Sequence, residues 1–132
     1  MTNYFKMEQA LRTILEKLED IDFALLGTFN LSLQGIEITP HDLDLLTDDE
    51  GVDKIGKIFA STITEEKEDH YKETKFYVSG VEVHVVSSEN NSLRPRNFQR
   101  ETIWIQKGDL KIPCMSLKSE LQFYQQAGRA KD

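Results

Sequence analysis

The sequence has few of the features that mark secreted or membrane-spanning proteins. It contains one cysteine, Cys114, which excludes an intrachain disulfide and is typical of a reducing compartment. Between apolar neighbours in LKIPCM, Cys114 is interpreted as a buried structural thiol rather than a nucleophile. No apolar run approaches the roughly 20 residues that a membrane helix needs, and the N-terminus lacks the pattern of a signal peptide. We therefore expect a cytoplasmic protein without a membrane partner.

Positive charge is also scarce. Lysine and arginine number 16 against 23 aspartates and glutamates, which gives a formal net charge of −7. A general nucleic-acid binder usually presents a basic face, so this balance argues against a nucleic-acid partner. The chain has 132 residues, of which 39% are hydrophobic, and this is enough for one modest core. We expect a single domain over residues 1–132.

Hydrophobic periodicity predicts helices and strands in alternation, followed by further strands and a closing helix. This order indicates an α/β or α+β fold with a mixed sheet and flanking helices. The predicted helices cover 5–18, 28–35 with Thr28 as N-cap, 48–61, and 116–130 with Ser116 as N-cap and Glu120 nearby. The predicted strands cover 22–27, 42–46, and the runs ETIWI and LKIPCM. Residues 75–86 are interpreted as two strands or one bent strand, with Ser79 and Gly80 as the turn or bulge.

A long unpatterned stretch, residues 87–101, is interpreted as a loop. Arg94 and Arg96 lie in it. A solvated position is the default for both arginines, although either could contact a phosphate or a partner.

The stretch ITPHDLDLLTD places two acids on alternate positions of a predicted strand. Residues two apart on a strand face the same way, so Asp42 and Asp44 share one face while Leu43 and Leu45 share the other. Mg²⁺ prefers oxygen ligands and often takes one or two carboxylates together with substrate phosphates. An isolated Asp-x-Asp could equally be the wet face of an amphipathic strand.

A candidate phosphate-binding turn precedes the acidic pair. Gly27 and Thr28 follow a predicted buried strand and open a predicted short helix. Glycine lets a phosphate approach the backbone, amides at a helix N-terminus attract anions, and the Thr28 hydroxyl adds a donor. The order of turn, helix and acidic strand is more specific than any one of these signals.

The segment LLGTFNLSLQGIEITPHDLDLLTD resembles the core signature of the minimal nucleotidyltransferases of the DNA polymerase beta superfamily. Gly27 and Thr28 match the family's glycine–hydroxyl pair, Gly35 its second glycine, and Asp42 and Asp44 its metal-binding acids. Further on, VSGVEVHVV and YQQAGRAKD are similar to the family's third acidic strand and its closing helix with a Gly-Arg motif. The resemblance extends from about residue 22 to the end of the chain.

The chain departs from this family at two points. The first pair is Gly-Thr in place of Gly-Ser, and the third acid, an aspartate in the family, is best matched by Glu82. His84 shares a strand face with Glu82 and is the rival ligand. Both could instead belong to a half-exposed strand whose valines face inward.

The resemblance implies transfer of a nucleotidyl group from a nucleoside triphosphate to an acceptor hydroxyl, with Mg²⁺ or Mn²⁺ as cofactor. Gly27 and Thr28 would hold the outer phosphates, Asp42 and Asp44 would bind the metal, and Glu82 would be a third ligand or a base. The alternative is a catalytically silent domain of the same fold that acts as a binding or regulatory protein. Such a domain could belong to a toxin–antitoxin or resistance pair. A homodimer or a partner protein could complete the cleft.

Overall fold

The structure is a computed structural model that describes the backbone of residues 2–131 and the side chains of residues 4–128. Seven strands form one mixed sheet in the order β3-β4-β5-β2-β1-β7-β6. The helices are α1 (Thr2–Lys17), α2 (Gly27–Leu33), α3 (Asp49–Ile58) and α4 (Leu117–Lys131), with a 3-10 helix η1 (Phe98–Glu101). The strands are β1 (Ala24–Leu26), β2 (Leu43–Thr47), β3 (Thr64–Glu65), β4 (Lys72–Val78), β5 (Val81–Ser87), β6 (Thr102–Lys107) and β7 (Leu110–Met115).

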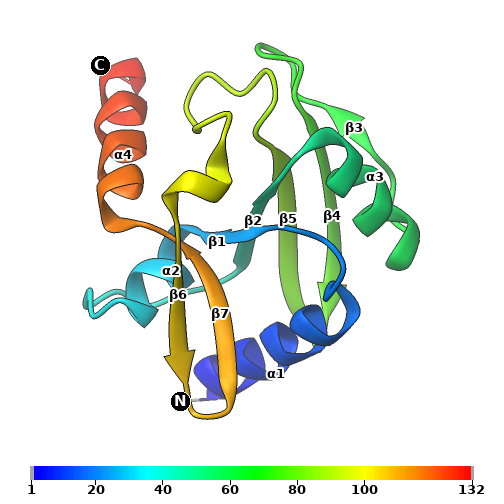
Figure 1. The fold of residues 1–132 in the computed structure, drawn as a ribbon, viewed down its shortest axis with the longest axis vertical. Helices are drawn as coiled ribbons and strands as arrows, with labels where there is room; N and C mark the ends of the chain where they lie inside the picture. The colour runs from blue at the N-terminus through cyan, green and yellow to red at the C-terminus, as the bar shows by residue number, and fades with distance from the viewer. Residues whose placement is uncertain (1, 132) are drawn as a thin grey trace.

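This architecture confirms the predicted α+β class with a mixed sheet and flanking helices. Figure 1 shows α1 at the bottom of the view and α4 at the upper left, at the opposite end of the molecule. The side chain of Arg129, in the Gly-Arg motif of α4, lies outside the described residues. Within the described part of the chain, no helix has both the length and the apolar composition needed to cross a membrane.

Two predicted element boundaries are wrong in ways that matter for the site. Helix α2 begins at Gly27, with Leu26 as its N-cap and no side-chain cap, so Thr28 is not the N-cap. Strand β2 begins at Leu43, so Asp42 lies immediately before the strand rather than in it. The predicted stop at Gly35 agrees with the end of α2 at Leu33, because Gly35 has φ +95° and follows the C-cap.

One face of the sheet carries the main hydrophobic core. Apolar side chains of α1 and α3 pack there against alternate residues of the central strands. Leu43 and Leu45 of β2 and Val83 and Val85 of β5 are all fully buried in this core. Cys114 is buried in it as well, which confirms its interpretation as a structural thiol, and burial raises the pKa of this thiol to about 12. The leucines beside the acidic pair therefore serve packing, as their positions predicted.

The opposite face carries a smaller cluster, which consists of Ala24, Leu26, Leu46, Phe98 and Met115. Phe98 covers it from η1, so the 87–101 segment packs on the sheet instead of extending into solvent. Because this cluster covers only part of the face, polar side chains of β2 and β5 remain accessible beside it. The candidate site lies on this second face.

The strand register decides which residues meet there. Strand β1 pairs antiparallel with β2 and places Leu26 opposite Asp44, so the turn at Gly27 comes next to Asp44. Strand β5 pairs parallel with β2 and places His84 opposite Asp44. The central acid thus has the glycine turn on one side and a histidine on the other.

Candidate active site

Asp44 lies directly against the Gly27 turn. An added Cβ at Gly27 would lie 2.6 Å from Oδ2 of Asp44, and Gly27 has φ +74°, which L side chains rarely adopt. The lack of a side chain at Gly27 therefore lets the carboxylate lie against the turn. The acid strand and the glycine turn are brought together as the sequence predicted.

The environment of Asp44 disfavours its charged form. Burial raises the pKa of Asp44 to about 6, and the negative charge of Asp42 adds to the shift. Positive charge on His84 and Arg94 opposes it. Asp44 is thus a partly buried acid whose charge is not fully compensated by its protein neighbours, and a cation beside it would favour the carboxylate.

His84, the rival ligand, contacts Asp44 more directly than Glu82 does. Nδ1 of His84 lies 3.7 Å from Oδ1 of Asp44, and Nε2 of His84 lies 2.6 Å from Oε1 of Glu73 on β4. Glu82 is half-buried on the same face of β5, two residues earlier, and pairs with Tyr77. The register of β2 and β5 thus places His84 opposite Asp44. The family resemblance had favoured Glu82 for this position.

Gly27, Asp44 and His84 line a cleft of about 400 Å³. Of the predicted site residues, Gly27 and Asp44 line it, whereas Thr28, Asp42 and Glu82 are not among its lining residues. Among the described side chains, no group of three or more His, Cys, Asp and Glu residues is arranged to hold a metal ion. One or two carboxylates, together with substrate phosphate oxygens and water molecules, would still complete the octahedral ligand set that Mg²⁺ usually takes.

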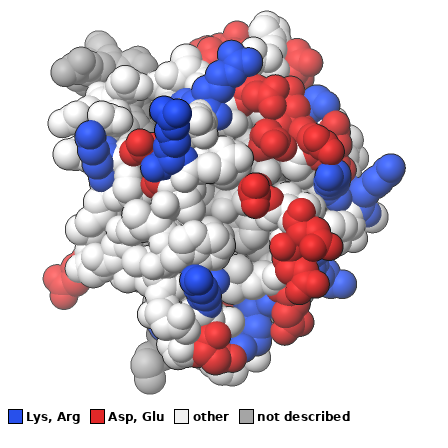
Figure 2. All heavy atoms as spheres, in the orientation of Figure 1, with Lys and Arg blue, Asp and Glu red and all other residues white. Residues whose placement is uncertain are grey.

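The rim of the cleft is acidic and aromatic. Its lining residues include Glu66, Glu68, Asp69, Tyr71 and Tyr124. Figure 2 shows acidic side chains crowded on the side of the molecule that carries α3 and β3, with few on the side of α4. The charge distribution favours a positively charged molecule at this rim.

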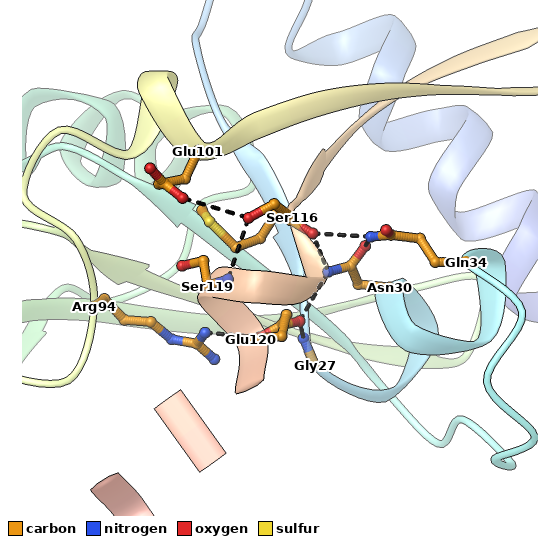
Figure 3. Close-up of polar contacts among 9 residues, drawn as sticks. Gly27, Asn30, Gln34, Arg94, Glu101, Ser116, Ser119 and Glu120 are labelled. Atoms are coloured by element: carbon orange, nitrogen blue, oxygen red, sulfur yellow. Dashed lines mark hydrogen bonds and ion pairs between the residues drawn. The ribbon is translucent and has the colours of Figure 1, made fainter. Parts of the chain in front are cut away.

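Glu120 is a buried residue of the site that the sequence did not reveal as such. The sequence predicts Glu120 only as a residue near the Ser116 N-cap. Ser116 does cap α4, since its Oγ accepts a hydrogen bond from the Ser119 amide at 3.2 Å. Glu120 instead points into the protein and is 1% exposed. Its Oε2 accepts hydrogen bonds from the Gly27 amide at 2.7 Å and from Nδ2 of Asn30 at 2.8 Å. Figure 3 shows the Glu120 carboxylate of α4 bonded to these two groups of α2.

Arg94 completes the same network, so its default interpretation as a solvated loop residue is wrong. Its side chain is 7% exposed, and its Nη1 donates to Oε1 of Glu120 at 2.7 Å. The guanidinium carbon lies 3.5 Å from the centroid of the Phe123 ring. Arg94 also lines the cleft together with Gly27 and Asp44. A buried cation is thereby fixed close to the acidic centre.

Comparisons with known proteins identify the fold and the family. A crystal structure of an inferred nucleotidyltransferase from Thermotoga maritima superposes with a TM-score of 0.84, at 22% identity, covering 96% of this chain and 87% of that chain. At this identity the likeness shows the fold. A comparison with curated proteins found no significant match.

A family model described as aminoglycoside-2''-adenylyltransferase matches residues 10–132. That match includes every predicted site residue, and the chain therefore belongs to the aminoglycoside-2''-adenylyltransferase family, with a nucleotidyltransferase fold.

Proposed function

We propose that the protein transfers a nucleotidyl group from a nucleoside triphosphate to an acceptor hydroxyl, with Mg²⁺ or Mn²⁺. The observation that carries this proposal is the contact between Asp44 and the Gly27 turn inside the cleft. This contact places a carboxylate whose charge is not fully compensated beside the turn that is expected to receive the phosphates. Family membership supports the same kind of reaction.

Asp42 and Asp44 would hold the divalent ion, with Glu82 as the third predicted ligand. The fit is supported by the chemistry of the donors, because burial and the negative charge of Asp42 raise the pKa of Asp44, and a hard cation would relieve that repulsion. When bound, the ion would neutralise phosphate charge and orient the triphosphate. Asp42 and Asp44 themselves would fix where the phosphates lie relative to the acceptor.

Gly27 and Thr28 would receive the outer phosphates. The Gly27 amide already donates to Glu120, and the Asp44 carboxylate fills the space that a side chain at Gly27 would need. Gly27 would therefore contribute by letting that acid lie beside the phosphates. The Thr28 hydroxyl would supply a donor beside it. This division of roles matches a reaction that depends on positioning and charge neutralisation more than on covalent catalysis.

The acceptor would be a hydroxylated cation. The family description names aminoglycosides, which carry several amines and hydroxyls, and the acidic rim of Glu66, Glu68 and Asp69 would favour such a molecule. Tyr71 and Tyr124 on the same rim could cover its apolar ring faces.

A second candidate is a catalytically silent binding or regulatory protein of the same fold, for example in a toxin–antitoxin or resistance pair. Three observations favour it. Glu82 does not line the cleft, the Gly27 amide is occupied by Glu120, and the described residues form no three-ligand metal group. A homodimer or partner protein would then supply what the cleft lacks.

Labelled ATP and GTP, each with Mg²⁺ or Mn²⁺ and a panel of aminoglycosides, test the enzyme proposal directly. We expect a labelled acceptor with the wild-type protein and a loss of rate of roughly 100-fold or more in Asp42→Asn and Asp44→Asn. Asp20→Asn, an exposed position outside the cleft, is the matched control and should retain the rate.

Calorimetry separates the two candidates. Binding of Mg²⁺-ATP that depends on Asp44, without transfer to any acceptor, supports the silent protein. Failure of the wild type to bind either nucleotide at millimolar concentration sinks the enzyme proposal. Equal binding after both aspartate substitutions contradicts the metal assignment.

A further inference from the structure

The cleft contains a cation that was not among the predicted site residues. Among the described residues that line it, Arg94 is the only lysine or arginine, while the lining acids include Asp44, Glu66, Glu68 and Asp69. A triphosphate carries several negative charges and would meet repulsion from these acids. One divalent ion and one arginine would together offset much of it.

The guanidinium of Arg94 is held in place on two sides. Glu120 accepts a hydrogen bond from its Nη1, and the Phe123 ring lies against its face. A guanidinium has five N–H donors, so this arrangement leaves several of them unused by Glu120. In Figure 3 the other terminal nitrogen points away from Glu120. Arginine commonly recognises phosphate by donating two such N–H groups at once.

Glu120 ties this arginine to the turn that Asp44 contacts. The same carboxylate accepts the Gly27 amide and the Asn30 side-chain amide, and Asn30 also donates to the Met115 carbonyl at 2.9 Å. One buried carboxylate thus sets the relative positions of Gly27 on α2 and Arg94 in the loop after β5. Both lie on the wall of one cleft.

From this arrangement we infer that Arg94 is a phosphate-binding residue of the cleft and that Glu120 and Phe123 of α4 are its positioning residues. The ligand is the triphosphate of a nucleoside triphosphate, so the inference rests on the proposed nucleotidyl transfer. It assigns α4 a role in substrate binding: the helix fixes the orientation of the guanidinium before the nucleotide arrives, which lowers the ordering cost of binding.

Calorimetric binding of three probes tests the assignment of Arg94: Mg²⁺-ATP, inorganic tripolyphosphate with Mg²⁺, and adenosine. Arg94→Met keeps an apolar stem against Phe123 but removes the charge. We expect it to weaken binding of ATP and tripolyphosphate by roughly 10- to 100-fold, the range for loss of a hydrogen bond to a charged group. Adenosine binding should not change, and Arg94→Lys should recover part of the loss. The matched control is Arg96→Met, an exposed arginine of the same loop that does not line the cleft.

A double-mutant cycle tests the positioning role of Glu120. Glu120→Gln keeps the size of the side chain but removes its negative charge and replaces one of its two acceptor oxygens with an NH₂ donor. We expect weaker binding of Mg²⁺-ATP in this variant, and no further loss when it is added to Arg94→Met, because Glu120 acts through the arginine. A merely structural glutamate would weaken ATP binding by the same factor in both backgrounds. If Glu120→Gln does not fold, the comparison of Arg94→Met with Arg96→Met decides the assignment.

The outcomes separate this inference from the proposed function. ATP binding that depends on Asp44 but is unchanged in Arg94→Met overturns the inference and leaves the proposed function standing. Tripolyphosphate binding that depends on Arg94, without binding of ATP or nucleotidyl transfer, supports the arginine site and overturns the proposed function. A wild-type protein that binds neither ATP nor tripolyphosphate overturns both.

Discussion

The two faces of strand β2 differ in almost every physical respect. On one face Leu43 and Leu45 are fully buried among apolar side chains of α1 and α3. On the other face Asp44 lies in a cleft, with its side chain 29% exposed, beside a histidine and a glycine turn. The first face is packed for stability, whereas the second retains an acid in surroundings that disfavour its charge. One five-residue strand thus separates the part of the protein that holds the fold from the part that would bind a ligand.

The largest expected effect tests the packed face. Leu45→Ala removes a fully buried side chain from the main core and should lower the free energy of unfolding by about 2–5 kcal/mol, since the lost burial and the cavity both contribute. Urea denaturation measures this change. The neighbouring substitution Asp44→Asn should cost far less at pH 7, and an equal loss in both variants would mean that the two faces do not differ as described.

The second prediction concerns pH and the cleft face. The pKa of Asp44 is raised from 3.8 to about 6, so the folded state binds this proton more tightly than the unfolded state. The stabilisation from protonation is therefore fully present below pH 3.8 and is lost as the pH rises through about 6. Relative to the wild type, Asp44→Asn should be more stable at pH 7.5 than at pH 4 by about 2 kcal/mol. Denaturation of both proteins at the two pH values measures this difference, and a constant offset would contradict the raised pKa.

The smallest change in stability is expected at the glycine turn. Gly27→Ala forces an L residue into a left-handed conformation, which costs about 1–2 kcal/mol, and its Cβ would displace the Asp44 carboxylate. Gly80→Ala is a matched control, because Gly80 has a similar φ of +77° but no neighbouring atom within 4 Å. We expect similar thermal stability in the two variants.

Nucleotide binding should distinguish these two glycine variants. Gly27→Ala is expected to weaken Mg²⁺-ATP binding at least tenfold, because small displacements of a binding group can have such effects. Gly80→Ala should bind as the wild type does. If both variants bind equally well, the contact between Gly27 and Asp44 has no part in recognition.

Helix α4 shows where the sequence could not have predicted the site. Its amphipathic pattern predicts an apolar inner face, yet Leu121 is 59% exposed while Glu120 is 1% exposed. The partners of Glu120 explain the reversal, because a carboxylate can be buried once donors satisfy it. Those donors come from Gly27, Asn30 and Arg94, which lie far away in the chain. Local periodicity carries no information on contacts of this kind.

The third acid shows a different limit. The family pattern favoured Glu82, and both Glu82 and His84 lie on the expected face of β5. Alternation along a strand settles which face a side chain occupies but not which residue stands opposite a given position of the neighbouring strand. The parallel register of β2 and β5 pairs Asp44 with His84.

The sequence by itself determined the order of most elements, the buried leucines beside Asp44, and the order of the glycine turn and the acidic strand along the chain. These features depend on hydrophobic alternation and on short connections, which are local properties of the chain. Only the tertiary structure decided that His84 faces Asp44, and that Glu120 and Arg94 meet at the Gly27 turn. Strand register and the burial of a paired charge depend on contacts between distant segments, and these contacts exist only once the sheet and α4 have assembled.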